Sequence, residues 1–170
     1  MRLVCVVIIA VFLSSCQEDN HKPVKVNTDQ LKEQLVDANK EAAEIESNQI
    51  DGYVKRRKLE VTKSPTGLRY VIYHDDEGDQ AEDEQTVVVK YTVSLLNGRE
   101  CYNTDEGPEE FKVGHDYVES GLHEGIKQMS TGDKAIMIIP SHLAHGIAGD
   151  FEQIPIRSTI VYDIELVDIK

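Results

Sequence analysis

Hydrophobic and polar residues alternate along the C-terminal half of the chain, from Val87 to Lys170, with the period of two that is typical of β-strands. One short segment, Gly121–Met129, instead has apolar residues at helical spacing, and we expect its helix within residues 118–130. The strands expected from the alternation cover residues 68–73, 86–95, 110–113, 134–139 and 158–169. The pattern therefore predicts an α+β domain in which an antiparallel sheet packs against one helix.

Turn residues divide these elements. Asn97-Gly98 is a strong hairpin signal, and Gly132 lies where a glycine commonly ends a helix. The core is expected where the inward faces of the strands meet the apolar face of the helix. That set contains Val87, Val89, Tyr91, Val93, Leu95, Leu122, Ile126, Met129, Ile160, Tyr162, Ile164 and Leu166. Burying each large side chain contributes about 1.5–3 kcal/mol, so the domain needs no disulfide.

Residues 29–63 predict a helical segment rich in Glu, Lys, Gln and Ala. Its narrow apolar stripe consists of Leu31, Leu35, Ala38, Ala42 and Ile45, and Gly52 is expected to break or kink the segment into two helices. The stripe can be covered by the rest of the chain or by a second copy in a homodimer, or the segment can be a simple spacer, and these alternatives stay open. The turn at residues 64–67 predicts the boundary of a second domain, residues 64–170.

The first residues resemble a bacterial lipoprotein signal. A basic start and a short apolar run, Leu3–Leu13, end in Leu13-Ser14-Ser15-Cys16, which resembles a lipobox, and the run is shorter than the roughly 20 residues that span a bilayer. A plain signal peptide with a chance cysteine is the alternative. We expect a signal peptide over residues 1–15, a lipid on Cys16 and a flexible tether over residues 16–28. The expected location is the cell envelope of a Gram-negative bacterium, at the outer membrane because residue 17 is not Asp. Glu18-Asp19 resembles an export tag of Bacteroidetes lipoproteins.

Charge and cysteine content exclude several classes of protein. The formal net charge is -13, which argues against binding nucleic acid. No phosphate-binding glycine loop is visible, and we expect no cofactor. Of the three cysteines, Cys5 leaves with the signal and Cys16 takes the lipid, so Cys101 is left without a disulfide partner. A partly buried thiol is the expected role of Cys101.

Four segments of the C-terminal half together resemble the FKBP-type peptidyl-prolyl cis-trans isomerases. They read FKVG, GLHEGIKQMSTGDKA, IPSHLAHG and STIVYDIELVDI. The resemblance implies a bent antiparallel sheet half-wrapped around one short helix, with a cleft that holds a proline side chain. It implies isomerisation of X–Pro bonds in proline-containing polypeptide clients, which assists the folding of envelope proteins. Such a cleft binds the twisted amide better than the planar one.

The resemblance assigns the family's pocket positions to five residues of this chain: Tyr91, Phe111, Val118, Ile154 and Tyr162. Each of them is equally suited to plain core packing, and inward aromatic residues on strands usually have that role. Their joint occurrence at the spacing of the family favours a pocket.

Five other positions depart from the family. Cys101-Tyr102 stands where many active members have Phe-Asp, so the expected carboxylate is absent there. Leu122 replaces the tryptophan at the floor of the pocket, Glu119 replaces an isoleucine, and His145 replaces a tyrosine. The departures imply a reshaped pocket, with weak or altered activity and poor affinity for the family's macrolide inhibitors.

Three other functions compete with the isomerase. The lost acidic and tryptophan positions favour a non-catalytic module that binds peptides or acts as a chaperone. A metal site could draw on His115, His123, His142, His145 and Asp150, but zinc needs three or four ligands on a rigid frame, so we expect no metal. A Ser-His-Asp hydrolase is disfavoured, because no serine lies in a nucleophile elbow.

Overall fold

The computed structural model describes residues 28–170. The chain divides into two compact units, residues 1–37 and 38–170, and the second unit contains all of the described strands. The expected signal peptide, the lipidation site Cys16 and nearly all of the expected tether lie outside the described residues. Within the described part, no helix combines the length and apolar character that crossing a membrane requires.

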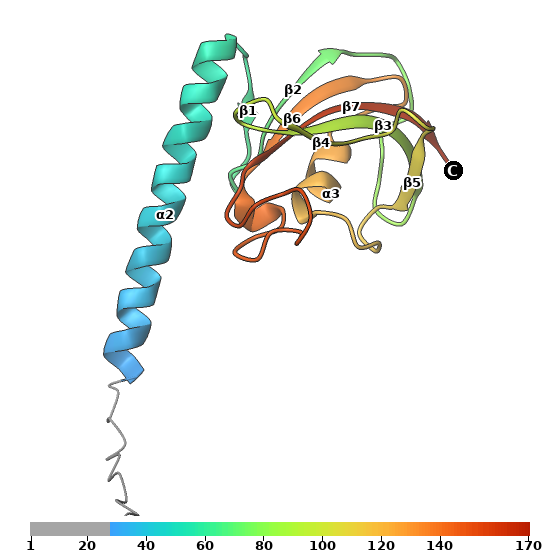
Figure 1. Cartoon of the computed structure of the whole chain (residues 1–170). Coiled ribbons are helices and arrows are strands. Elements are labelled where there is room, and N and C mark those ends of the chain that lie inside the picture. The colour runs from blue at the N-terminus through green and yellow to red at the C-terminus, as the bar shows by residue number, and fades with distance from the viewer. Residues whose placement is uncertain (1–27) are drawn as a thin grey trace, which may run out of the picture. The chain divides into compact units, whose positions relative to one another are not determined.

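The second unit is built on an antiparallel sheet that curves over a short helix, α3 (Ser120–Ile126) (Figure 1). Its strands within the described residues are β1 (Thr62–Lys63), β2 (Arg69–His74), β3 (Thr86–Leu95), β4 (Glu100–Asn103), β5 (Glu109–Lys112), β6 (Lys134–Ile139) and β7 (Ile160–Ile169). Their order across the sheet is β1-β2-β6-β7-β3-β4, and β5 pairs with the first half of β3. The expected α+β architecture is confirmed.

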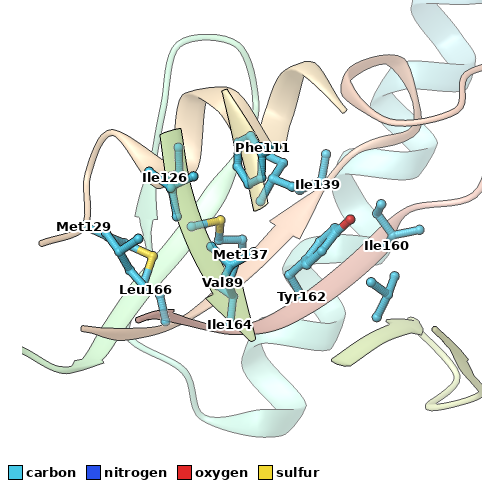
Figure 2. Close-up of a cluster of buried hydrophobic side chains, with 14 of the residues drawn as sticks. Val89, Phe111, Ile126, Met129, Met137, Ile139, Ile160, Tyr162, Ile164 and Leu166 are labelled. Carbon is cyan, nitrogen blue, oxygen red and sulfur yellow. The ribbon is translucent and has the colours of Figure 1, made fainter. Parts of the chain in front are cut away.

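The core lies between α3 and the inward face of the sheet. Alternation along β3 and β7 places every second side chain there, so that Val87, Val89, Ile160, Ile164 and Leu166 are at most 1 % exposed. Figure 2 shows side chains of these strands on the side of Ile126 of the helix, together with Met137 of β6, the strand next to β7. Two glycines of α3 allow this close approach. A Cβ on Gly125 would lie 2.4 Å from the Met137 sulfur, and one on Gly121 would lie 2.4 Å from Ile139.

The helix is shorter than the sequence predicts, and Gly132 is not its C-cap. α3 ends at Ile126, and Gly132, with φ +97°, lies in the turn that leads into β6. The buried carboxylate of Asp133 organises that turn, because it accepts backbone hydrogen bonds from Ser130 and Asp76, both at 2.7 Å. The positive φ therefore serves the turn, where glycine is favoured for the same reason as at a helix end.

The N-terminal helical segment is one continuous helix, α2 (Thr28–Arg57), and the predicted break at Gly52 is wrong. Ile50 and Tyr53 flank Gly52, and both are buried in a second apolar cluster with Ile138 and Val161 of the sheet. Packing on both sides outweighs the cost of about 1 kcal/mol for a glycine within a helix.

The predicted stripe of α2 is not the buried face of the helix. Leu31, Leu35 and Ile45 are 45, 56 and 52 % exposed, so the buried apolar residues of α2 are instead Ile50 and Tyr53. A homodimer through this stripe stays a prediction, as does a simple spacer.

Polar contacts also integrate the second half of α2 into the unit. The buried guanidinium of Arg69 donates to Asp51 at 2.7 and 3.0 Å and to the Ser47 hydroxyl at 2.8 Å. The Glu46 carboxylate accepts from the backbone amide of Ser141 at 2.7 Å and from the Thr159 hydroxyl at 2.6 Å. Ser141 and Thr159 lie at the two ends of the loop between β6 and β7, so Glu46 holds both ends of that loop.

Candidate functional site

An open cavity of about 570 Å³ lies between α3, the inward face of the sheet and the loop of residues 140–159. Its apolar lining consists of Val89, Tyr91, Val93, Phe111, Val118, Leu122, Ala144 and Tyr162. Its polar lining consists of Tyr102, Glu109, Glu110, Tyr117, Glu119, His145, Asp150 and Glu152. The cavity thus combines an apolar interior with a set of phenols and carboxylates, which is the usual composition of a ligand site.

The register of the sheet explains why the aromatic residues converge. Tyr162 on β7 pairs with Val93 on β3, two residues from Tyr91, so both tyrosines point toward the helix from neighbouring strands. Their rings meet edge to face with centroids 5.3 Å apart. Phe111 reaches the cavity from β5, and its ring packs edge to face against His123 of α3 at 5.6 Å.

Four of the five positions assigned from the family pattern line this cavity: Tyr91, Phe111, Val118 and Tyr162. Ile154 does not line it, and its side chain is instead 3 % exposed within the adjoining core. A pocket role for Ile154 therefore has no support from the cavity geometry. The loop of Ile154 nonetheless contacts the site through its backbone, because its amide donates to Asp150 at 2.8 Å.

Four of the five departing positions also line the cavity: Tyr102, Glu119, Leu122 and His145. Leu122 is 2 % exposed, so it closes the apolar floor where the family has a tryptophan. Cys101 is a buried free thiol outside the lining, with its sulfur 3.8 Å from the carbonyl oxygen of Gln153. A nucleophilic role for Cys101 in this cavity is excluded by that placement.

Glu119 links two opposite sides of the site. Its carboxylate accepts a hydrogen bond from the Tyr162 hydroxyl at 3.0 Å and lies 2.9 Å from Nε2 of His145. The Glu119 side chain is only 11 % exposed, so these contacts compensate the cost of burying a charge. Burial raises the pKa of the Tyr162 phenol well above its ordinary value, and the negative charge of Glu119 raises it further.

Tyr102 and Asp150 form a second phenol–carboxylate pair, in which the Tyr102 hydroxyl donates to Oδ2 of Asp150. Oδ1 of Asp150 accepts the backbone amides of Glu152 at 2.9 Å and Ile154 at 2.8 Å. The hydrogen bond from the Tyr102 hydroxyl to Asp150, together with burial and the charge of Asp150, raises the pKa of Tyr102 to about 12. Burial alone would raise the pKa of Asp150, but the three hydrogen bonds outweigh it and lower that pKa to about 2.

The pair places a carboxylate next to the position where the family pattern has one. The family pattern places a carboxylate on the strand, at the position of Tyr102, and a tyrosine on the loop, at the position of His145. In this chain the strand supplies the phenol and the loop supplies the carboxylate, from Asp150. A carboxylate is therefore present beside position 102, although the strand itself does not supply it.

Sequence reasoning missed several residues of the lining: Tyr117, Glu109, Glu110, Ala144 and Glu152, with Asp150 considered only as a metal ligand. Glu109 could have been found, because it lies two residues before Phe111 on β5 and therefore shares its face. Its carboxylate accepts from the Tyr91 hydroxyl at 2.8 Å. Loop residues such as Glu152 follow no periodicity, so the sequence holds no comparable signal for them.

The histidines considered as metal ligands have separate partners. His142 contacts the carbonyl oxygen of Thr66 at 2.9 Å, and His115 pairs with Glu84. His123 accepts the Gly114 amide at 3.0 Å and contacts the Asp116 carbonyl oxygen at 3.1 Å. Among residues 28–170, no group of three or more His, Cys, Asp or Glu side chains is arranged to hold a metal ion.

Comparisons with known proteins show which family this chain resembles. The family model described as FKBP-type peptidyl-prolyl cis-trans isomerase matches residues 77–167. The chain is 37 % identical over 127 residues to the FKBP-type peptidyl-prolyl cis-trans isomerase FkpA of Escherichia coli strain K12, which covers 72 % of this chain and 47 % of that protein. It is 31 % identical over 117 residues to a probable isomerase of the same type from Haemophilus influenzae, covering 69 % of this chain and 48 % of that protein. The chain thus spans about half the length of these curated relatives.

Solved structures show the same fold. The crystal structure of FkpA from Escherichia coli has 34 % sequence identity and a TM-score of 0.66, covering 99 % of this chain and 81 % of that one. A peptidyl-prolyl cis-trans isomerase from Pseudomonas syringae has 25 % identity and a TM-score of 0.67, covering 77 % of this chain and 95 % of that one.

Proposed function

Because the chain belongs to the FKBP-type peptidyl-prolyl cis-trans isomerases, we propose that it isomerises X–Pro bonds of polypeptide clients in the cavity beneath the sheet. One observation carries the proposal: four residues at the family's pocket positions, Tyr91, Phe111, Val118 and Tyr162, line one open cavity. A proline ring is apolar and compact, and such a site can enclose it while the flanking chain leaves through the open side.

The reaction needs no nucleophile. Rotation about an X–Pro bond is slow because the planar amide must lose its resonance, which costs about 18–20 kcal/mol. The twisted amide has less charge separation than the planar one, so an apolar interior favours the twisted form. Each 1.36 kcal/mol of preferential binding to that form accelerates the reaction about tenfold.

The polar groups of the cavity explain why we expect a weak enzyme. Tyr91, Tyr102 and Tyr162 each donate their hydroxyl hydrogen to a carboxylate, Glu109, Asp150 and Glu119 respectively. A hydroxyl has one hydrogen to donate, so a substrate carbonyl must compete with an ionised acceptor for it. Stabilisation of the twisted amide therefore rests mainly on the apolar walls. We expect poor binding of macrolide inhibitors for the same reason and because of the leucine floor.

Filling the cavity from the loop of residues 140–159 tests the proposal. Ala144 is half-buried in the cavity lining, whereas Ala148 is exposed on the same loop outside the lining. Ala144→Trp should abolish the cis–trans acceleration of a short proline peptide, measured by NMR exchange spectroscopy, and Ala148→Trp should leave it unchanged. Equal rates for wild type and Ala144→Trp would refute catalysis in this cavity.

A non-catalytic peptide-binding or chaperone module is the second candidate. It is favoured because the three cavity phenols already donate their hydroxyl hydrogens to carboxylates of the protein. The same NMR experiment separates the two functions. Peptide shifts on binding, without any increase in the exchange rate over buffer, would establish the module and exclude the isomerase. A variant such as Ala144→Trp should remove binding in either case.

We further propose that the protein is a lipoprotein anchored through Cys16 at the outer membrane of a Gram-negative envelope, where it assists folding. The order of basic start, apolar run and lipobox-like Leu13–Cys16 supports this. Cys16→Ser should shift the protein from the membrane fraction to the soluble fraction and prevent labelling by palmitate. Membrane retention of that variant would contradict the anchor.

A further inference from the structure

Carboxylates from three separate segments of the fold line the cavity. Glu109 and Glu110 belong to β5, whereas Asp150 and Glu152 belong to the loop of residues 140–159. Glu119, just before α3, is the fifth acidic residue of the lining, and no lysine or arginine is part of it.

Most of this charge is not neutralised by the protein. Glu119 lies beside His145, and Glu110 pairs with Lys170. Glu109 and Asp150 accept hydrogen bonds from neutral phenols and backbone amides, which orient a carboxylate without cancelling its charge. The Glu152 side chain has no hydrogen-bond or ion-pair partner among the described residues.

The charges act on the inside of the cavity. Glu109 and Glu119 contribute to raising the pKa of Tyr91 after the effect of burial, and Asp150 and Glu152 contribute to raising that of Tyr102. Both phenols line the cavity, so a group bound there lies in the same negative field.

The lining also contains an exposed aromatic residue. Tyr117 lines the cavity, yet its side chain is fully exposed, at 108 %. An aromatic face that no part of the described chain covers, next to carboxylates, is a binding partner for a lysine or arginine side chain. Solubility alone would explain scattered acidic residues, but not an exposed ring among them.

We propose, on the premise of the isomerase function above, that the cavity selects proline segments in which a lysine or arginine directly precedes the proline. The proline ring occupies the apolar interior, and the preceding side chain reaches the polar part of the lining, to which Glu109, Glu152 and Tyr117 belong. A basic side chain there gains from uncompensated charge, and an acidic one is repelled.

Three matched tetrapeptides that differ only before the proline, with lysine, norleucine or glutamate, test this selection by NMR exchange spectroscopy on the intact chain. Lysine should exceed norleucine in kcat/KM by about threefold or more, as one or two solvent-exposed charge pairs provide. Glutamate should be the poorest substrate. The ratio of kcat/KM for the lysine peptide to that for the norleucine peptide should fall toward one when the salt concentration rises from about 0.01 M to about 1 M, because salt screens the charges.

Charge-removing variants locate the effect. Glu109→Gln/Glu152→Gln should bring the lysine-to-norleucine ratio of kcat/KM close to one, whereas Glu60→Gln, exposed and outside the lining, should leave that ratio and both rates unchanged. A norleucine rate equal to or above the lysine rate, or a preference unchanged in the double variant, overturns the selection but leaves the isomerase intact. Background rates on all three peptides overturn the proposed function itself.

Discussion

A double-mutant cycle on Tyr102 and Asp150 measures the contact that ties the loop of residues 140–159 to strand β4. Tyr102→Phe removes only the phenol oxygen, and Asp150→Asn keeps the size of the side chain but removes its charge. The remaining hydrogen bonds of Asp150 come from the backbone amides of Glu152 and Ile154, which both single variants retain. The cycle therefore measures how much more strongly the phenol interacts with the carboxylate than with the amide that replaces it.

The structure sets the expected magnitude. A hydrogen bond to a charged group contributes about 1.5–3 kcal/mol, whereas a solvent-exposed charged contact contributes about 0–1 kcal/mol. Tyr102 and Asp150 are both half-buried. We therefore expect each single variant to lose about 1 kcal/mol of unfolding free energy and the pair to show a coupling energy of about 1 kcal/mol.

The dependence of stability on pH is an independent check. The pKa of Asp150 is lowered from 3.8 to about 2 in the folded chain. Because the folded pKa lies below the unfolded one, the stabilisation is present above about pH 4 and is lost as the pH falls toward about 2. The stability difference between wild type and Asp150→Asn should be constant at neutral pH and shrink in that acidic window.

Urea unfolding followed by circular dichroism suits this chain, which has no tryptophan. Tyr73 and Asp163 provide a matched control, because the same two groups form a 2.7 Å hydrogen bond outside the cavity lining. That pair should show weaker coupling, since Tyr73 is 53 % exposed, and no effect on isomerase activity. Additive effects of Tyr102→Phe and Asp150→Asn on the free energy of unfolding would refute the reasoning. So would a stability difference between wild type and Asp150→Asn that stays the same as the pH falls from about 4 to about 2.

Two further predictions concern the helices. Gly125→Ala should destabilise the protein by about 1–3 kcal/mol, because the new Cβ would lie 2.4 Å from the Met137 sulfur, whereas Gly52→Ala should stabilise it by about 0.5–1 kcal/mol. Thermal unfolding of both variants checks this, and equal shifts would contradict the packing argument. If α2 forms a homodimer through its exposed stripe, Leu35→Glu should convert dimer to monomer in sedimentation equilibrium. A wild-type monomer at micromolar concentration would exclude that dimer.

The parts of the fold that depend on residues close together in the sequence were predictable, and the parts that depend on distant residues were not. The alternation of Val87, Val89 and Val93 encodes a buried strand face locally, and the hairpin at Asn97-Gly98 is likewise local, with Gly98 at φ +86°. The break at Gly52 was predicted wrongly because the sheet residues that bury its neighbours lie far away in sequence. Local propensity cannot register packing of that kind.

The residues of the site that lie on strands were easier to predict than those that reach it from a distant loop. Phe111 and Tyr162 lie on strands whose alternation fixes the direction of their side chains, so their presence in the cavity was predictable. Asp150 meets Tyr102 across 48 residues, through a loop without periodicity. A departure at one position, here the missing acid at Tyr102, predicts a changed pocket but does not reveal which loop residue compensates for it.

The helical segment and the cavity are connected through one carboxylate. Glu46 accepts hydrogen bonds from Ser141 and Thr159, the two ends of the loop that contributes His145 and Asp150 to the site. A loop whose ends are both fixed loses conformational freedom along its whole length. The second half of α2 is therefore more than a spacer, because it restricts the loop that carries Asp150 into the cavity.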